Sequence, residues 1–286
     1  MPTFGRPPFV VLEALHPSQV GAELVACFAQ LGARDDRLEH AHALATQSLG
    51  LSEGEPLVRA GRAIARDIDQ GVGAGVADGY HNSQHFLEVM LTALYLARLA
   101  RFAAHRAARV VTAALMHDFH HDGSHGTASP FRLESLAALK AQPYLQAAHV
   151  DEAECRRLEA LVLATDPSGG VPFARACWMH HAAGAACPPL HPELPLPLGR
   201  LRSEPDLAQE AVLLAEADVL PSIGLTPEHA QQLHSRLAVE WNITLGRDDK
   251  LRFIDRMIGE ISVSSFFMPN IEAVRQAYVG AKARRV

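Results

Sequence analysis

Apolar residues recur at spacings of three and four along most of the chain, in segments rich in Ala, Leu, Glu and Arg. This periodicity is typical of amphipathic helices, whereas the alternating Val, Ile, Thr and Tyr runs that predict strands are scarce. The chain is therefore expected to be an all-α helical bundle. The predicted helices span residues 18–31, 35–49, 56–70, 81–101, 107–117, 131–140, 151–165, 170–182, 206–220, 227–243, 248–267 and 270–283.

These helices are expected to form one catalytic unit over residues 1–286, with 1–70 as an N-terminal helical scaffold and 75–272 as the core. A chain of 286 residues, 48% of them apolar, can bury one substantial core. Glycines at 71, 73 and 75 break the helical pattern between scaffold and core. Residues 183–205 contain six prolines and are predicted to form a surface loop.

Charge and cysteine content narrow the choice of partners and compartment. The 26 basic and 32 acidic residues give a net charge of −6, which argues against adhesion to nucleic acid polymers or anionic membranes. The basic cluster at 282–285 is explained by a solvated helix end. The four cysteines form no C-x-x-C pair, and no signal peptide or membrane-spanning run is found. We expect a cytoplasmic protein that acts on a small molecule, with a homodimer as one option for its assembly.

Histidines gather in one part of the sequence in a pattern that suits metal ions. His81 and His85 are four residues apart, as are His117 and His121, so each pair can share one face of a helix. Asp118 directly follows an apolar helical segment and adds a hard anionic ligand next to His117. The sequence therefore predicts a metal site at the end of that helix.

A further carboxylate, Asp218, interrupts an apolar helix, where it is costly unless a cation or hydrogen bonds compensate it. The order His, then His-Asp, then a distant Asp resembles the metal-dependent phosphohydrolases of the HD superfamily. The neighbouring residues resemble the catalytic domain of class I cyclic-nucleotide phosphodiesterases over residues 79–272. The motifs that carry this resemblance are Tyr80-His81-Asn82-Ser83-Gln84-His85, His117-Asp118-Phe119-His120-His121-Asp122-Gly123, Leu163-Ala164-Thr165-Asp166, Ala217-Asp218 and Phe253-Ile254-Asp255.

The resemblance implies a role for each of these motifs. It implies that Asp118 bridges to a second ion, that His81 protonates the leaving oxygen, and that His121 supports the water shell of the second ion. Phe253 would stack on the base of the substrate, and Tyr80 would also contact the substrate. The side chains implied to hold the first divalent ion are His85, His117, Asp118 and Asp218.

The donor types indicate which metals fit. Mixed nitrogen and oxygen ligands suit zinc or iron at the first position, and a second position filled mostly by water suits magnesium or manganese. The expected activity is hydrolysis of a cyclic-nucleotide-like or small phosphodiester by a metal-bridging hydroxide, with a histidine as general acid. The alternatives are an HD phosphomonoesterase or nucleotidase, an HD-type di-iron oxygenase, and a ligand sensor without activity.

The chain departs from the family where the family recognises its base. Lys250 stands three residues before Phe253, at the position of the family's purine-reading glutamine, and favours a substrate with an anionic or carbonyl-rich distal group. Family spacing places the family's pocket glutamate at Gln146, and Pro221 replaces an asparagine near the base. The metal motifs thus match, and the specificity motifs do not.

Other candidate residues have ordinary structural explanations. Asp166 could belong to the catalytic site or only cap a helix. Cys177 with His180 and His181 lacks a fourth ligand at a recognisable spacing, so a second metal site there is not expected. His120 is expected to be a bystander. Hydrogen bonding within the fold is the default expectation for His105, His149, His180, His181, His229 and His234.

Overall fold

The computed structural model describes residues 4–124 and 129–280, so His125 and the basic cluster at 282–285 lie outside the described residues. The described residues contain helices and no strand, which confirms the all-α prediction. The helices are α1 (Pro17–Gly32), α2 (Arg37–Ser48), α3 (Pro56–Asp69), α4 (Ser83–Leu99), α5 (Ala104–Met116), α6 (Arg132–Ala147), α7 (Glu152–Leu163), α8 (Gly170–Ala183), η1 (Leu196–Arg202), α9 (Pro205–Ile223), α10 (Pro227–Glu240), α11 (Arg247–Ile258), η2 (Ser265–Phe267) and α12 (Met268–Gly280).

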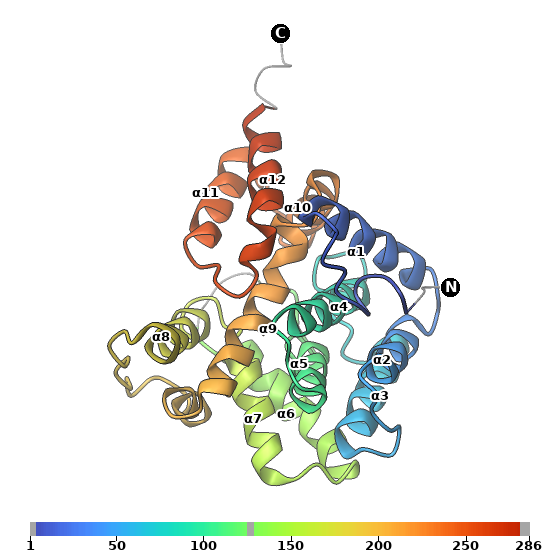
Figure 1. The fold of residues 1–286 in the computed structure, drawn as a ribbon, viewed down its shortest axis with the longest axis vertical. Coiled ribbons are helices and arrows are strands. Elements are labelled where there is room, and N and C mark those ends of the chain that lie inside the picture. Colours follow the sequence, from blue (N-terminus) through green and yellow to red (C-terminus); the bar gives the residue numbers. More distant parts are fainter. Residues whose placement is uncertain (1–3, 125–128, 281–286) are drawn as a thin grey trace.

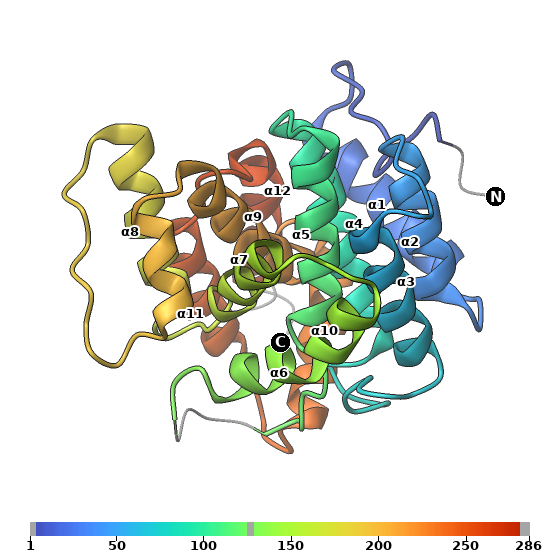
Figure 2. The same cartoon turned by 90° about the horizontal axis from the view of Figure 1, so that it is seen from below.

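Helices α4, α5 and α9 pack against one another at the centre of the molecule. Figures 1 and 2 show α1, α2 and α3 on one side of this centre and α8 and α11 on the other. The side chains of α4 are buried almost all round from His85 to Ala97, because this helix is covered on every side. No helix in the described part of the chain has the length and apolarity needed to cross a membrane.

Polar caps set the starts of several helices. The Asn82 carboxamide accepts hydrogen bonds from the backbone N–H groups of Gln84 and His85, so the asparagine of the Tyr80-His81-Asn82 motif starts α4. Asp151 caps α7 and Thr226 caps α10 in the same way. The Asn82 cap matters for the site, because it fixes the position of His85 in the first turn of α4.

The glycine-rich segment holds the two histidine motifs together. Gly73 and Gly75 both have positive φ, and a Cβ on Gly75 would lie 2.0 Å from the carbonyl oxygen of His81. The carbonyl of Gly73 accepts a hydrogen bond from His120 N–H at 3.0 Å, and that of His81 accepts one from Val76 N–H at 2.8 Å. This segment therefore connects the loop before α4 to the loop after α5.

Several predicted boundaries differ from the structure. Helices α6 and α9 continue past their predicted ends and contain Pro143 and Pro221, which each remove one helical hydrogen bond without ending the helix. Helix α11 ends at Ile258 rather than 267, because Glu216 of α9 binds the following backbone N–H groups. The 183–205 loop contains a 3-10 helix, η1, that buries Leu198 and Leu201.

Candidate metal centre and cavity

Two imidazoles and two carboxylates from the start of α4, the end of α5 and the interior of α9 meet at one point. His85 Nε2, in the first turn of α4, lies 3.2 Å from Asp118 Oδ2 and 3.2 Å from Asp218 Oδ1. His117 Nε2, at the end of α5, lies 3.1 and 3.6 Å from the same two oxygens. The two Nε2 atoms are 3.2 Å apart. We call these four residues the quartet.

The quartet fits a divalent cation. The Ala114 carbonyl is 2.8 Å from His117 Nδ1 and accepts its hydrogen, which leaves the Nε2 lone pair free to bind a metal. Metal–ligand bonds of about 2.0–2.2 Å hold neighbouring ligand atoms about 3–3.5 Å apart, which agrees with the separations of 3.1 and 3.2 Å among His85, His117 and Asp118. Two buried Nε2 atoms this close need a proton or a cation near them, and the two carboxylates supply compensating negative charge.

The pKa values of the quartet residues also indicate a site that favours positive charge. Burial lowers the pKa of both imidazoles, but hydrogen bonds and charge from Asp118 and Asp218 outweigh it and raise the pKa of His85 to about 9 and that of His117 well above its usual value. Burial raises the pKa of Asp118, and the His117 and His81 charges outweigh it and hold that pKa well below its usual range. Positive charge at this point therefore stabilises the quartet.

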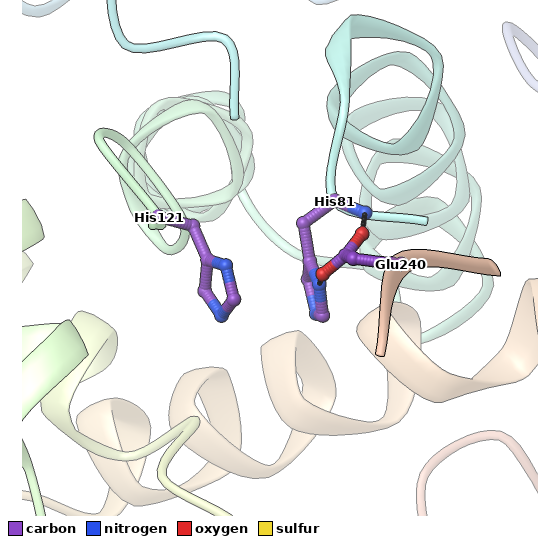
Figure 3. Close-up of side chains that lie close together, drawn as sticks. All are labelled: His81, His121 and Glu240. Carbon is purple, nitrogen blue, oxygen red and sulfur yellow. Dashed lines mark hydrogen bonds and ion pairs between the residues drawn. The ribbon is translucent and has the colours of Figure 1, made fainter. Parts of the chain in front are cut away.

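His81 lies beside the quartet and is oriented by a carboxylate from a distant helix (Figure 3). Its Nδ1 is 2.6 Å from Oε1 of Glu240, and its Nε2 is 3.9 Å from Oδ2 of Asp118. The other Glu240 oxygen accepts the backbone N–H groups of Tyr80 and His81 at 2.6 and 2.8 Å. Burial raises the pKa of Glu240, and its bond to His81 more than offsets this. The ionised Glu240 thus fixes the His81 ring with Nδ1–H donating and Nε2 directed toward Asp118.

His121 stacks on the opposite face of the His81 ring, with ring centroids 3.9 Å apart and an interplanar angle of 19°. Its Nδ1 accepts the backbone N–H of Gly123 at 3.0 Å. Burial lowers the pKa of His121, so the neutral ring carries its hydrogen on Nε2. His81, His121 and Glu240 lie close enough together to surround a cation. Because the Glu240 carboxylate already accepts three N–H groups, we interpret Glu240 as a residue that orients His81 rather than as a metal ligand.

A cavity of about 470 Å³ opens onto this cluster. Its metal wall carries His81, Asp118, His121 and Asp218. Another wall comes from α8, α11 and the residues just after α11. We call it the α8–α11 wall, and its members are Val171, Arg175, Phe253, Arg256, Met257, Glu260 and Ile261. The size is that of a pocket for a nucleotide-sized ligand, for which about 300–1,000 Å³ is usual.

Comparison with solved structures identifies the fold. The phosphodiesterase domain of the RhoPDE fusion protein from the choanoflagellate Salpingoeca rosetta is 18% identical to this chain, with a TM-score of 0.59 over 96% of this chain and 95% of that one. A second structure of the Salpingoeca rosetta rhodopsin phosphodiesterase domain is 17% identical (TM-score 0.60, 92% and 87% covered). LmjPDEB1, solved in complex with IBMX, is 14% identical (TM-score 0.62, 91% of each chain). The chain has the fold of a phosphodiesterase domain.

At these identities the similarity establishes the fold and not the activity. No protein-family model and no curated protein sequence matches the chain. The motif resemblance in the sequence and the similarity of the whole fold therefore agree with each other, and the chemistry rests on the side chains in the cavity.

Within the phosphodiesterase fold, the three predicted substrate contacts fall in different places. Phe253 lines the cavity on the α8–α11 wall. Tyr80 packs its ring 4.6 Å from that of His85 and is not among the cavity-lining residues described. Lys250 is buried outside this lining, with Nζ 5.2 Å from the centre of the Phe253 ring, and burial lowers its pKa to about 7. Substrate contact by Tyr80 and Lys250 stays a prediction.

The family's pocket glutamate is not represented by Gln146. Gln146 is exposed on α6 and lies away from the cavity. The carboxyl group that α6 contributes is that of Glu134, in its first turn. Burial, together with the negative charges of Asp166 and Asp118, raises the pKa of Glu134 to about 7.

Asp166 combines the two functions that the sequence left open. Its carboxylate accepts hydrogen bonds from the backbone N–H groups of Phe131, Ser168 and Gly169, so it joins the start of α6 to the turn before α8. It also lines the cavity. His180 and His181, for which hydrogen bonding within the fold was expected, bond to the carbonyls of Ala185 and Leu201.

Two functional carboxylates could not be found from the sequence. Glu240 closes α10, 159 residues after His81, and no motif marks it. Glu216, two residues before Asp218, accepts the backbone N–H groups of Ser262, Val263 and Ser264. It thereby ties the loop after α11 to the helix that carries Asp218. The only signal for Glu216 was its position in an otherwise apolar helix.

Proposed function

We propose that this chain is a metal-dependent phosphohydrolase that cleaves a cyclic-nucleotide-like or other small phosphodiester. The observation that carries the proposal is the convergence of the quartet with the oriented His81 on one wall of a nucleotide-sized cavity. A structural role would not require two imidazoles, two carboxylates and an oriented histidine at one point. The phosphodiesterase fold supports the same reaction class.

The quartet would hold the first ion, zinc or iron by its mixed nitrogen and oxygen donors, and Asp118 would contribute to a magnesium or manganese ion beside it. Bound there, two divalent ions would supply Lewis acidity for the phosphoryl group and activate a water for in-line attack. The protein fixes the donors through Ala114 for His117 and through the Asn82 cap for His85. Neutral His121 would donate from Nε2 to a polar group in the cavity.

His81 is the proposed proton donor to the leaving oxygen. Glu240 accepts the Nδ1 hydrogen at 2.6 Å, so the proton that can be transferred is the one on Nε2. His81 also lies on the cavity wall, where a leaving oxygen can reach it.

The remaining cavity residues orient the substrate and its water. Glu134, whose pKa of about 7 lets it carry a proton near neutral pH, can orient a water near Asp118 by hydrogen bonding. Phe253 offers an aromatic face on which a base can stack. The purified protein would thus hydrolyse a phosphodiester that carries an aromatic or heterocyclic group.

Metal analysis combined with two chromogenic esters tests the proposal. We expect up to two divalent ions per chain and faster hydrolysis of bis-nitrophenyl phosphate than of nitrophenyl phosphate, followed by activity on one or more cyclic mononucleotides. Faster hydrolysis of the monoester would indicate a phosphomonoesterase instead. Two irons together with oxygen-dependent turnover would replace this proposal by an oxygenase. Full metal occupancy without hydrolysis of any phosphoester would indicate a ligand sensor.

A further inference from the structure

Three arginines line the cavity, and they differ in how they are paired. Arg132 bonds to Asp122 at 2.9 Å and to Ser124 Oγ at 2.6 Å. Arg256 bonds to Glu260 at 3.2 Å and to the Pro167 carbonyl at 3.0 Å. Arg175, on α8, has no hydrogen bond or ion pair with any residue in the described ranges 4–124 and 129–280. One of the three guanidinium groups is therefore available to a ligand.

No acidic side chain outside the described segments is available to pair with Arg175. Residues 1–3, 125–128 and 281–286 contain no Asp or Glu, so every acidic side chain of the protein lies in the described part. None of these carboxylates is paired with Arg175. Arg175 is only partly exposed, so the side chain has lost part of its hydration without gaining an acceptor among the described residues.

The carboxylates that share the cavity with Arg175 are largely engaged elsewhere. Glu216 accepts three backbone N–H groups of the loop after α11, and Asp166 accepts three others. Glu260 uses one oxygen for Arg256. The quartet carboxylates face His85 and His117. Glu134, on α6, also lines the cavity and is not paired with Arg175. No carboxylate of the described chain thus pairs with Arg175, and an anion brought in by a ligand would complement its charge.

We propose that Arg175 binds a second anionic group of the substrate, a phosphate or a carboxylate, while the phosphodiester lies at the metal wall. The inference rests on the proposed function, because it assumes that the reacting phosphoryl group occupies the quartet side. The forked guanidinium of Arg175 can donate two parallel hydrogen bonds to such a group. Lys250 is buried outside the cavity lining and cannot take over this role. Substrates with one additional negative charge are therefore the preferred class.

The cavity is long enough for two separate anionic groups. Along α9 its lining runs from Val212 to Asp218 and Val219, and six residues of helix span about 9 Å. Adjacent apolar residues such as Val171 and Met257 flank Arg175 on the same wall. A charge-assisted bond in such partly apolar surroundings is worth about 10- to 100-fold in affinity.

The test separates binding from turnover. Calorimetry in the presence of manganese would measure the Kd of two nucleotides that differ by one phosphate, thymidine 5′-phosphate and thymidine 3′,5′-bisphosphate. Both would be measured with wild type, Arg175→Met and Arg175→Lys. We expect wild type to bind the bisphosphate about 10- to 100-fold more tightly, Arg175→Met to lose most of that ratio, and Arg175→Lys to keep part of it. Arg101→Met is the control, because Arg101 is also unpaired among the described residues but lies outside the cavity.

Equal affinity of wild type for the two nucleotides, or an unchanged ratio in Arg175→Met, would overturn the role of Arg175. Hydrolysis of bis-nitrophenyl phosphate by the same wild-type preparation tests the proposed function separately. A preparation that hydrolyses the ester but shows no ratio refutes only the anion site. One that shows the ratio but hydrolyses no phosphoester refutes the phosphohydrolase and retains an anion-binding cavity.

Discussion

At the metal wall of the cavity, Asp118 and Asp218 both contact the buried imidazoles of His85 and His117, whereas on the α8–α11 wall the Arg175 guanidinium and one buried Glu260 oxygen have no partner in the described chain. The first wall is organised before any substrate arrives, because each ligand is held by a neighbour. The second wall holds groups that a bound ligand can satisfy. The comparison suggests that the metal wall determines the reaction and the α8–α11 wall determines the substrate.

The largest expected effect comes from removing the shared carboxylate of the metal wall. Asp118→Ala deletes the oxygen that lies 3.2 Å from His85 and 3.1 Å from His117 and leaves the site short of a ligand for both ions. We expect metal content to fall below one ion per chain and hydrolysis to fall by about 1,000-fold or more. Metal analysis and esterase assays would measure both quantities.

Asp255→Ala serves as the control for Asp118→Ala, because Asp255 is an exposed aspartate paired with Arg275 and lies outside the cavity. It should retain metal and activity. If Asp118→Ala kept two ions, Asp118 would not bridge them, and metal binding would depend less on the contacts among these side chains than the geometry suggests.

A smaller and more selective loss is expected at the proton donor. His81→Ala should keep its metals, because the quartet does not include this ring, and should lose about 100- to 10,000-fold on substrates with poor leaving groups. Nitrophenyl esters, whose leaving group needs no proton, should lose far less. The measurement is kcat on a cyclic nucleotide and on bis-nitrophenyl phosphate, with His120→Ala as the control. Equal losses on both substrates would count against His81 as the acid.

The side chains that the sequence groups as metal ligands lie close together in the structure, because most of them belong to short local motifs, and their roles stay predictions. His81 and His85, like His117 and Asp118, are neighbours in the chain, and the helix geometry follows from their spacing. Asp218 was found because a carboxylate in an apolar helix needs an explanation. The sequence also predicted most helices, whose apolar spacing is strong, and misjudged ends that depend on tertiary contacts, as where Glu216 captures the residues after Ile258.

The α8–α11 wall was harder to predict, because its residues come together only through the fold. Arg175 lies on a helix with no motif, and Glu240 acts on a histidine from another helix. Lys250 shows the limit of reasoning by position: it stands where the family places a pocket residue, yet its side chain is buried outside the cavity lining. A count along the chain identifies a helical position but does not determine which groups cover it.

The loop after α11 connects the two walls, and Glu216 is the residue that holds it. Glu216→Gln replaces an oxygen acceptor with an NH₂ group that faces the N–H groups of residues 262–264. We expect the free energy of unfolding to fall by about 1–3 kcal/mol and KM to rise about tenfold with a smaller change in kcat. Urea unfolding and steady-state kinetics measure these, and exposed Glu228→Gln is the control. An unchanged KM would mean that the loop does not shape the substrate side.

The smallest expected effect concerns Lys250 and is read from stability. Burial lowers its folded-state pKa from 10.5 to about 7, so below pH 7 both states carry the proton and the buried ammonium destabilises the fold fully. Between pH 7 and 10.5 the unfolded chain binds more protons than the native one, so the free energy of unfolding rises with pH over this window.

Lys250→Met, which keeps the length of the side chain without its charge, should therefore be more stable than wild type by about 1–3 kcal/mol at pH 6 and nearly equal to it at pH 10. Exposed Lys140→Met should show no such dependence on pH. Urea unfolding of the three proteins at both pH values measures the differences. A stability difference between Lys250→Met and wild type that does not change with pH would indicate that the Lys250 ammonium contacts an acceptor. A loss of substrate affinity in Lys250→Met at unchanged stability would indicate that Lys250 contacts the substrate, as the family's glutamine is expected to do.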